Sequence, residues 1–144
     1  MEDLSQQAFA LADILATMFP QRPATPSELE FFRQRPEIAG YASDYNDVVL
    51  NPTLPAAQHQ PVLLNERLRQ YLRAFPNLVP QEMTIAEHQQ RNIGGPYQDN
   101  PTAMRQTILS RLLSGDPSAS PFTWQQQEAG RGVLSHLNKA KWGE

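Results

Sequence analysis

The chain has 144 residues and a mass of 16.3 kDa, which is enough for one domain with its own hydrophobic core. It contains no cysteine, so disulfide scaffolds, thiolate zinc sites and cysteine nucleophiles are excluded. The net charge of −3 argues against nucleic-acid binding through bulk positive charge, and no apolar run reaches the roughly 18–20 residues of a membrane span. Because the first residues include no basic segment, we also expect no secretory signal.

The first segment, residues 2–19, has the apolar period of a helix. Its apolar residues recur at steps of three and four: Leu4, Ala8, Leu11, Leu15 and Met18. Pro20 ends the segment, and a proline-rich joint follows. We therefore divide the chain into an N-terminal helical arm over residues 1–20 and a single compact helical domain over residues 25–144. The helix could act as an arm or could complete the core of that domain.

Capping signals mark the starts of four further helices. In Thr25–Glu28, a threonine at the cap position is followed by proline at the first helical position and by glutamate at the third. This order predicts a capping box. This helix should end before Pro36. Further start signals stand at Thr84–Glu87, Asn100–Pro101 and Thr123–Gln126. Gly94 and Gly115 occur where helices should end in left-handed geometry.

A β-hairpin is predicted near residues 38–50. The segments Ile38–Ala42 and Asp47–Leu50 contain tyrosine and β-branched residues, and the stretch between them is rich in Ser, Asp and Asn. An isolated hairpin is only marginally stable in water, so it should rest on helices or pair with another strand. The predicted fold is thus mainly α, with about six short helices and one small β-hairpin.

The longest helix should lie within residues 54–75. Its expected buried face consists of Val62, Leu64, Leu68, Leu72 and Phe75. Glu66, Arg69 and Arg73 should lie on a more polar side. Pro61 predicts either a separate turn before the helix or a kinked start.

Two more helices complete the chain, over Asn100–Ser114 and from Thr123 to about Lys141. Their expected core residues are Met104, Ile108, Leu109 and Leu112 in the first and Val133, Leu134 and Leu137 in the second. Gly130 and Gly132 should each weaken the second helix by about 1 kcal/mol relative to alanine. We expect the flanking residues Trp124 and Trp142 to be buried. An exposed tryptophan would instead indicate an interface anchor.

The strongest indication of an enzyme is a strand, Asp47–Leu50, followed by a helix that contains Asn65, Glu66 and Arg69. This order resembles the active site of zincin metalloproteases, whose helix motif is H-E-x-x-H. Asparagine and arginine stand where the two histidines belong, and neither can replace a neutral imidazole as a zinc ligand. We therefore interpret Glu66 as a structural partner for an arginine or a backbone group.

Other catalytic and binding patterns are missing from the sequence. The three histidines, His59, His88 and His136, lie in different segments, and no two of them are four residues apart. There is no G-x-S-x-G elbow, Walker loop or G-x-G-x-x-G, and no basic stripe with interleaved aromatic residues. We accordingly predict no catalytic, cofactor-binding or metal-binding residue, no nucleic-acid partner and no membrane partner.

Three groups of residues, in this order, are similar to a group of small uncharacterised proteins of tailed bacteriophages and prophages. These are Phe31–Ala42 followed by Asp47–Pro52, Asn65–Glu66 with Tyr71–Arg73, and Thr107–Ser118. The resemblance covers about residues 29–120, and Arg111–Ser118 is its most specific part. Pro61 and the extended N-terminal helix depart from the pattern. No known activity accompanies the group, and the resemblance implies a phage gene product of the virion or its assembly.

These observations lead to three hypotheses. The first is a non-enzymatic phage protein of the virion or its assembly, which binds capsid, portal or tail proteins and could also form homo-oligomers. It would reside in the virion, and in the host cytoplasm during assembly. The second is a small phage protein that binds and modulates a host factor, and the third is a degenerate zincin-like or unrecognised hydrolase.

Overall fold

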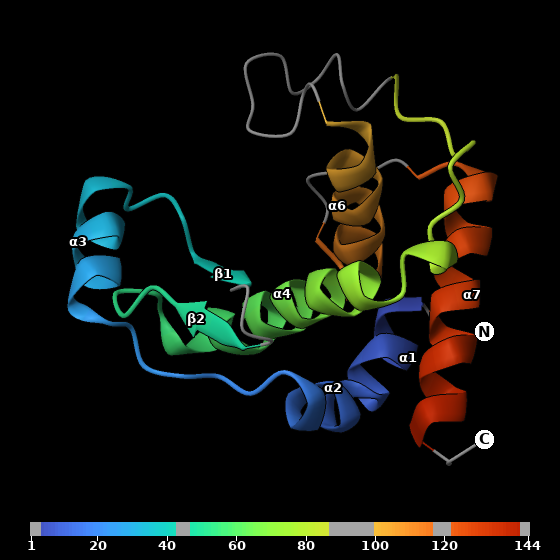
Figure 1. The fold of residues 1–144 in the computed structure, drawn as a ribbon. Coiled ribbons are helices and arrows are strands. Elements are labelled where there is room, and N and C mark those ends of the chain that lie inside the picture. Colours follow the sequence, from blue (N-terminus) through green and yellow to red (C-terminus); the bar gives the residue numbers. More distant parts are fainter. Residues whose placement is uncertain (1–3, 43–46, 87–99, 117–121, 142–144) are drawn as a thin grey trace.

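The computed structural model describes residues 4–42, 47–86, 100–116 and 122–141. These residues form a mainly α-helical fold with one small two-stranded hairpin, which confirms the predicted fold class (Figure 1). The elements are α1 (Leu4–Ala10), α2 (Ala12–Met18), α3 (Pro26–Gln34), β1 (Gly40–Ala42), β2 (Val48–Leu50), the 3₁₀ turn η1 (Ala56–Gln58), α4 (His59–Ala74), the 3₁₀ turn η2 (Pro76–Leu78), α6 (Pro101–Ser114) and α7 (Trp124–Lys141).

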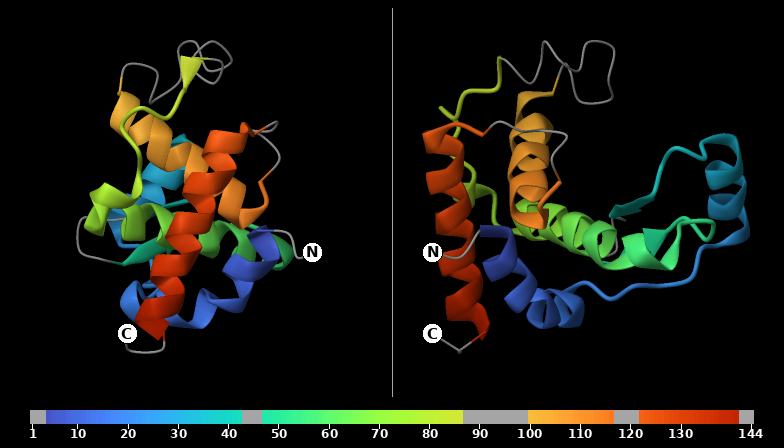
Figure 2. Two further views of the ribbon diagram at one scale, coloured as in Figure 1. Left: turned by 90° about the vertical axis from the view of Figure 1, so that its right-hand side faces the viewer. Right: turned by 180° about the vertical axis from the view of Figure 1, so that it is seen from behind.

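Helix α4 is the centre of the fold, and α6, α2, β1 and β2 pack around it (Figure 2). Leu64, Leu68 and Leu72 are buried as predicted, but Tyr71 is also completely buried, and Phe75 is partly exposed. Elements therefore cover α4 on more sides than a single apolar face would require. Pro61 lies in the first turn of the helix, after the separate turn η1, so the first of its two predicted alternatives is confirmed.

The N-terminal segment forms two helices where the sequence indicated one over residues 2–19. Leu11 separates α1 from α2, and its N–H donates to the Ala8 carbonyl at 3.0 Å, a bond three residues back that tightens the turn. The bend lets α1 pack against α6 and α7 while α2 packs against α4. Ala8 and Leu15 are wholly buried in the same apolar cluster as the α4 leucines, so both helices contribute to the core.

Helices α6 and α7 supply the rest of the core. All seven of their predicted core residues are buried. Their contact is close at Gly130, where an added Cβ would lie 2.5 Å from Cδ2 of Leu112, whereas nothing lies near Gly132. Helix α7 has 18 residues, but neither it nor another helix within the described ranges is long and apolar enough to cross a membrane.

The predicted helix caps at Thr25, Asn100 and Thr123 are confirmed. The Asn100 side chain accepts from the Ala103 N–H at 3.1 Å, and Thr123 and Gln126 exchange two bonds in a second capping box. Gly115 has a φ of 79° and ends α6 in the left-handed conformation. Glu87 and Gly94 lie outside the described residues.

The hairpin is confirmed, with β1 and β2 antiparallel and Tyr41 paired with Val49. It rests on α4, and both strands contact that helix. A single parallel bridge between Gln21 and Val48 pairs the chain that leads from α2 to α3 with strand β2. The hairpin therefore joins α4 to the segment that holds α3.

Candidate functional site

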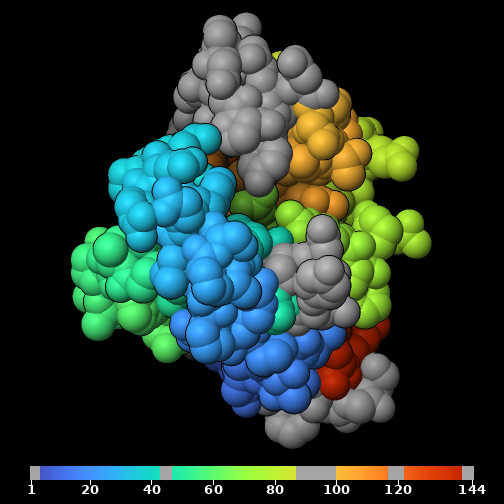
Figure 3. Space-filling view, turned by 60° about the vertical axis from the view of Figure 1, so that its left-hand side comes forward, coloured from blue at the N-terminus to red at the C-terminus, as the bar shows by residue number. Residues whose placement is uncertain are grey.

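Helix α3 and the extended chain on either side of it stand apart from the other helices (Figure 1). We call residues 20–36 the α3 finger. Among the described elements, α3 has few close backbone contacts with any other helix or strand. In the space-filling view, this segment forms the near surface of one side of the molecule (Figure 3). The finger therefore presents most of its surface to the outside.

Local chemistry defines where α3 begins and ends. The Thr25 side chain accepts from the Glu28 N–H at 3.3 Å, while the Glu28 carboxylate accepts from the Thr25 N–H at 2.8 Å. Pro26 occupies the first helical position, where its missing N–H costs nothing. Pro36 then prevents the helix from continuing through Arg35. Local chemistry thus defines both ends of the helix.

Arg22 fixes the finger to the hairpin. Its guanidinium donates to both Glu28 carboxylate oxygens, at 2.6 and 2.8 Å, and to the Asp47 carboxylate at 3.0 Å. The bidentate bond from Arg22 holds the pKa of Glu28 at about 2, well below its ordinary 4.5. The same carboxylates raise the pKa of Arg22. Sequence analysis missed this cluster because its residues are up to 25 positions apart.

A second set of contacts is aromatic. Phe31 lies 5.7 Å from Phe32 and 6.4 Å from Tyr41 of β1, measured between ring centroids. Phe32 is 3% exposed, whereas Phe31 is 41% exposed. A hollow of about 280 Å³ opens beside these rings and is lined by Ser27, Glu28, Phe31 and Tyr41. We call it the α3–β1 pocket.

Asn51 holds the chain that leads from α3 into the hairpin. Its amide donates to the Ile38 carbonyl at 3.0 Å, and its side-chain oxygen accepts from the N–H and hydroxyl of Thr53. Its own N–H donates to the Ala39 carbonyl at 2.8 Å. Asn51 is 3% exposed, and its polar side-chain atoms have partners. These hydrogen bonds fix the chain between α3 and β1 to the end of β2.

Exposed apolar side chains are concentrated on the finger. Five large hydrophobic residues are exposed among the described residues: Phe9, Leu29, Phe31, Phe75 and Trp124. Two of the five belong to the nine residues of α3. The charged residues Glu30 and Arg33 lie on the same helix and are at least half exposed. Apolar residues within a charged rim are typical of a protein-binding surface.

Trp124 is 75% exposed, so the expectation that it would be buried is wrong. It is the first residue of α7, and the cap at Thr123 fixes the start of the helix there. The buried face of α7 is instead formed by Val133, Leu134 and Leu137. Trp142 lies outside the described residues. An exposed tryptophan was the case in which the sequence analysis would indicate an interface anchor.

Glu66 is 5% exposed and therefore does not lie on the polar side expected for it. Its carboxylate accepts a bond from the Ala42 backbone and lies 3.6 Å from the Arg69 guanidinium. Burial raises its pKa, and the charges of Arg69, Arg73 and Arg111 oppose that rise. Oε2 has no hydrogen-bond partner within the described ranges. The interpretation of Glu66 as a partner of an arginine and a backbone group is confirmed.

The histidines do not form a site within the described residues. His59 bonds the Leu54 carbonyl, and His136 bonds the Tyr71 hydroxyl and contacts Phe75 in a tilted arrangement, with 4.6 Å between the ring centroids. His88 lies outside the described residues. No group of three or more metal-binding side chains occurs in the described part of the chain. Comparison of the chain with protein-family models, curated proteins and solved structures yields no match.

Proposed function

We propose that this chain is a non-enzymatic protein of a tailed-phage virion or of its assembly, and that it binds a capsid, portal or tail protein through the α3 finger. The observation that carries the proposal is the exposed helix α3, on which Leu29 and Phe31 are 40% and 41% exposed. The resemblance of about residues 29–120 to small phage proteins supplies the phage context.

The way in which α3 is held supports a binding role. Its position depends on the Arg22 ion pairs and on the contacts of Phe31 and Phe32 with Tyr41, and these contacts occupy only one side of the helix. Leu29 makes no contribution to the buried apolar cluster. A rigid helix that presents an unburied leucine loses little conformational entropy when a partner covers it. The finger is thus preorganised for binding.

The chemistry of the buried polar residues is consistent with this proposal. Glu66, the residue at the glutamate position of the zincin-like pattern, lies 3.6 Å from Arg69, and the charges of Arg69, Arg73 and Arg111 favour its ionised form. The Arg67 side chain donates to the Phe19 carbonyl at 2.8 Å, and that of Gln70 donates to the Asp47 carbonyl. These polar groups join elements to one another.

Quantitative mass spectrometry of purified particles tests the proposal. We expect peptides of this chain in virions or in assembly intermediates. Absence from both would overturn the proposal, and co-purification with a host protein alone would favour the host-factor alternative.

A matched pair of variants tests the role of the finger. Leu29→Ser should lower the number of copies in particles by at least about tenfold, as expected when an interface anchor is removed. Phe9→Ser changes a side chain of α1 with the same 40% exposure and should leave incorporation unchanged. Equal incorporation of both variants would show that α3 is not the contact. Circular dichroism and thermal melts confirm that both variants are folded.

A further inference from the structure

The α3 finger joins the rest of the molecule where the chain that leaves α2 pairs with β2. The Val48 N–H donates to the Pro20 carbonyl, and the Arg22 N–H donates to the Val48 carbonyl, both at 3.0 Å. We call residues 19–22 and 47–48 the base of the finger. Because α3 itself makes few close contacts with other elements, the direction in which it points depends on how this base is held.

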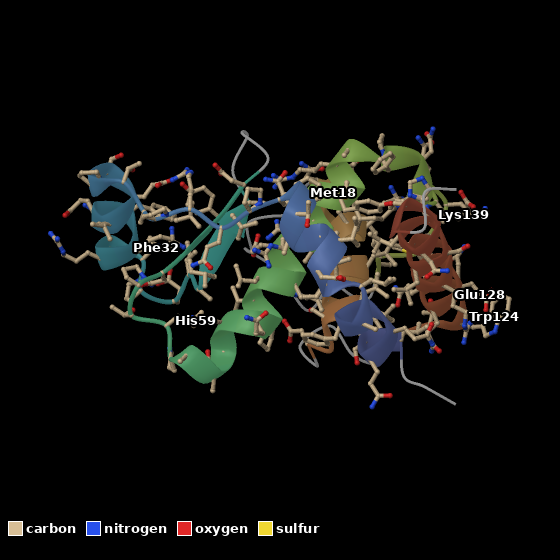
Figure 4. All side chains as sticks on the ribbon, turned by 90° about the horizontal axis from the view of Figure 1, so that it is seen from below. Met18, Phe32, His59, Trp124, Glu128 and Lys139 are labelled. Carbon is tan, nitrogen blue, oxygen red and sulfur yellow. The ribbon has the colours of Figure 1, made fainter. Side chains whose placement is uncertain are left out.

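Helix α3 lies far from the centre of the fold. In Figure 4, Phe32 of α3 and Lys139 of α7 lie at opposite ends of the molecule, and Figure 2 shows the extended chain that leads from α2 out to α3. A small rotation at the base therefore moves the exposed side chains of Leu29 and Phe31 by a larger distance. The angle at the base thus decides which way the binding helix faces.

Apolar burial holds the base in place. Phe19 and Val48 are 4% and 0% exposed, and both belong to the apolar cluster of the core. Phe32 of α3 lies outside that cluster and packs near Tyr41, with 6.1 Å between the ring centroids. The hydrophobic effect is non-directional, whereas a hydrogen bond weakens steeply when it bends. Hydrogen bonds are therefore better suited than apolar contacts to fixing the angle of the finger.

Two buried polar side chains of α4 make such bonds at the base. The Arg67 guanidinium donates to the Phe19 carbonyl at 2.8 Å, and the Gln70 amide donates to the Asp47 carbonyl at 3.1 Å. Arg67 and Gln70 are three residues apart, so they lie on the same side of the helix. Phe19 and Asp47 belong to the two different chain segments that pair at the base. Helix α4 therefore holds the backbone of both segments.

The burial of Arg67 is costly. The side chain belongs to a residue that is 8% exposed, and burial lowers its pKa. Within the described part of the chain it forms no ion pair, and its one hydrogen bond goes to the Phe19 carbonyl. A buried charge without a charged partner is unfavourable, and an apolar side chain in its place avoids that cost. A role in positioning accounts for Arg67 better than a contribution to stability does.

We propose that Arg67 and Gln70 are positioning residues that fix the direction in which the α3 finger presents its exposed side chains. The assignment rests on the proposed function, because it gives two residues of α4 a role in the binding element. A finger that points in one direction loses less orientational freedom when a partner binds than a finger that swings. The two residues thus preorganise a surface that they do not touch.

Distance measurements between spin labels on the purified full chain test this assignment. The chain contains no cysteine, so labels attached to Glu30→Cys of α3 and Lys139→Cys of α7 are the only ones present. Both positions are exposed. The otherwise unaltered chain should give one narrow distribution of α3–α7 distances. A second pair, Thr102→Cys of α6 with Lys139→Cys, reports on helices that do not belong to the finger.

A double variant and a matched control separate positioning from stability. Arg67→Met with Gln70→Met removes both donors and should make the α3–α7 distribution at least about twice as wide, while the α6–α7 distribution stays the same. Gln126 is the control, because it is 1% exposed and its amide also donates to a backbone carbonyl, that of Thr84, at 3.1 Å. Gln126→Met removes this bond at a site outside the finger and should leave the α3–α7 distribution unchanged.

Three results would overturn the proposal. These are an unchanged α3–α7 distribution in the folded double variant, an equally wide one in Gln126→Met, and a wide one in the otherwise unaltered chain. Thermal melts identify the folded variants, and if the double variant does not fold, Gln70→Met alone is judged by the same criteria. The measurements use only purified chain, so their failure is distinct from the absence of the protein from phage particles.

Discussion

The helical body, formed by α1, α2, α4, α6 and α7, and the α3 finger are stabilised by different interactions. The body buries side chains from helices that are distant in the sequence, and Leu15, Leu68 and Leu137 in it have no exposed surface. In the finger only Phe32 of α3 is buried, and the helix depends on a capping box and on Arg22. The comparison shows that α3 is held mainly by polar contacts and by one buried phenylalanine, whereas the body is held by extensive apolar burial.

The two regions also differ in how they hold a carboxylate. Glu28 in the finger accepts hydrogen bonds from Arg22 and Thr25, and its pKa falls to about 2. Glu66 in the body is buried, and burial raises its pKa although the charges of nearby arginines oppose the rise. The charged form is favoured at the first site and disfavoured at the second. Stability should therefore respond to pH with opposite sign in the two regions.

The largest expected difference between the regions comes from the same substitution in each. Leu68→Ala should lower the free energy of unfolding by about 2–5 kcal/mol, because Leu68 has no exposed surface and leaves a cavity in the core. Leu29→Ala should change it by less than about 0.5 kcal/mol, because Leu29 is 40% exposed. Urea denaturation followed by circular dichroism measures both. Similar losses in the two variants would contradict the division into body and finger.

The next effect concerns the finger alone. Glu28→Gln removes the carboxylate that accepts two hydrogen bonds from Arg22 and should destabilise α3 locally by about 1.5–3 kcal/mol, the usual contribution of a hydrogen bond to a charged group. Amide hydrogen exchange should accelerate in α3 and remain unchanged in α4. Glu30→Gln is the control, because Glu30 pairs with Arg33 on the half-exposed side of the same helix.

Acid should reproduce the effect of Glu28→Gln. The folded finger holds Glu28 ionised down to about pH 2, whereas the unfolded chain protonates it near 4.5. Its contribution is therefore complete above pH 4.5 and is lost as the pH falls from 4.5 towards 2. Exchange in α3 should accelerate over that interval in the unaltered chain and less so in the variant. Equal acceleration in both would show that another group controls α3.

Features that depend on neighbouring residues could be predicted from the sequence. The caps at Thr25, Asn100 and Thr123 and the left-handed end at Gly115 require only a few consecutive residues. The hairpin and the buried faces of α6 and α7 follow from periodicities of two and 3.6 residues. These signals together defined the mainly α fold.

Features that depend on distant residues could not be predicted. Periodicity placed Glu66 on a polar side, but the residue is buried and its carboxylate accepts a hydrogen bond from the Ala42 backbone of β1. Trp124 is apolar but precedes the buried face of α7, and its exposure depends on what surrounds the start of that helix. The Arg22 cluster needs the hairpin to bring Asp47 towards Glu28. In the candidate site, therefore, the ends of α3 and the strand that contains Tyr41 could be predicted from the sequence, but the contacts between them could not.

A smaller effect distinguishes two glycines of α7. An alanine at Gly130 would place its Cβ against the Leu112 and Leu113 side chains, so strain should offset the roughly 1 kcal/mol that alanine gains in a helix. Gly132 faces open space, and Gly132→Ala should stabilise the protein by up to about 1 kcal/mol. Thermal melts compare the two variants. A larger gain at Gly130 would mean that α6 and α7 are less closely packed than the structure shows.

The smallest net effect at neutral pH is expected for Glu66→Gln. Removal of the buried charge relieves a desolvation cost and also loses the attraction of Arg69, Arg73 and Arg111, so the two changes oppose each other. The dependence of the free energy of unfolding on pH tests Glu66 more directly. Because the folded chain holds the Glu66 proton more tightly than the unfolded chain, stability should fall as the pH rises from 4.5 to the raised pKa of Glu66. Denaturant melts across this interval should show that fall in the unaltered chain and a flatter curve in the variant. Identical curves would mean that the arginines compensate for the burial of the carboxylate, and the body and the finger would then hold their carboxylates in the same way.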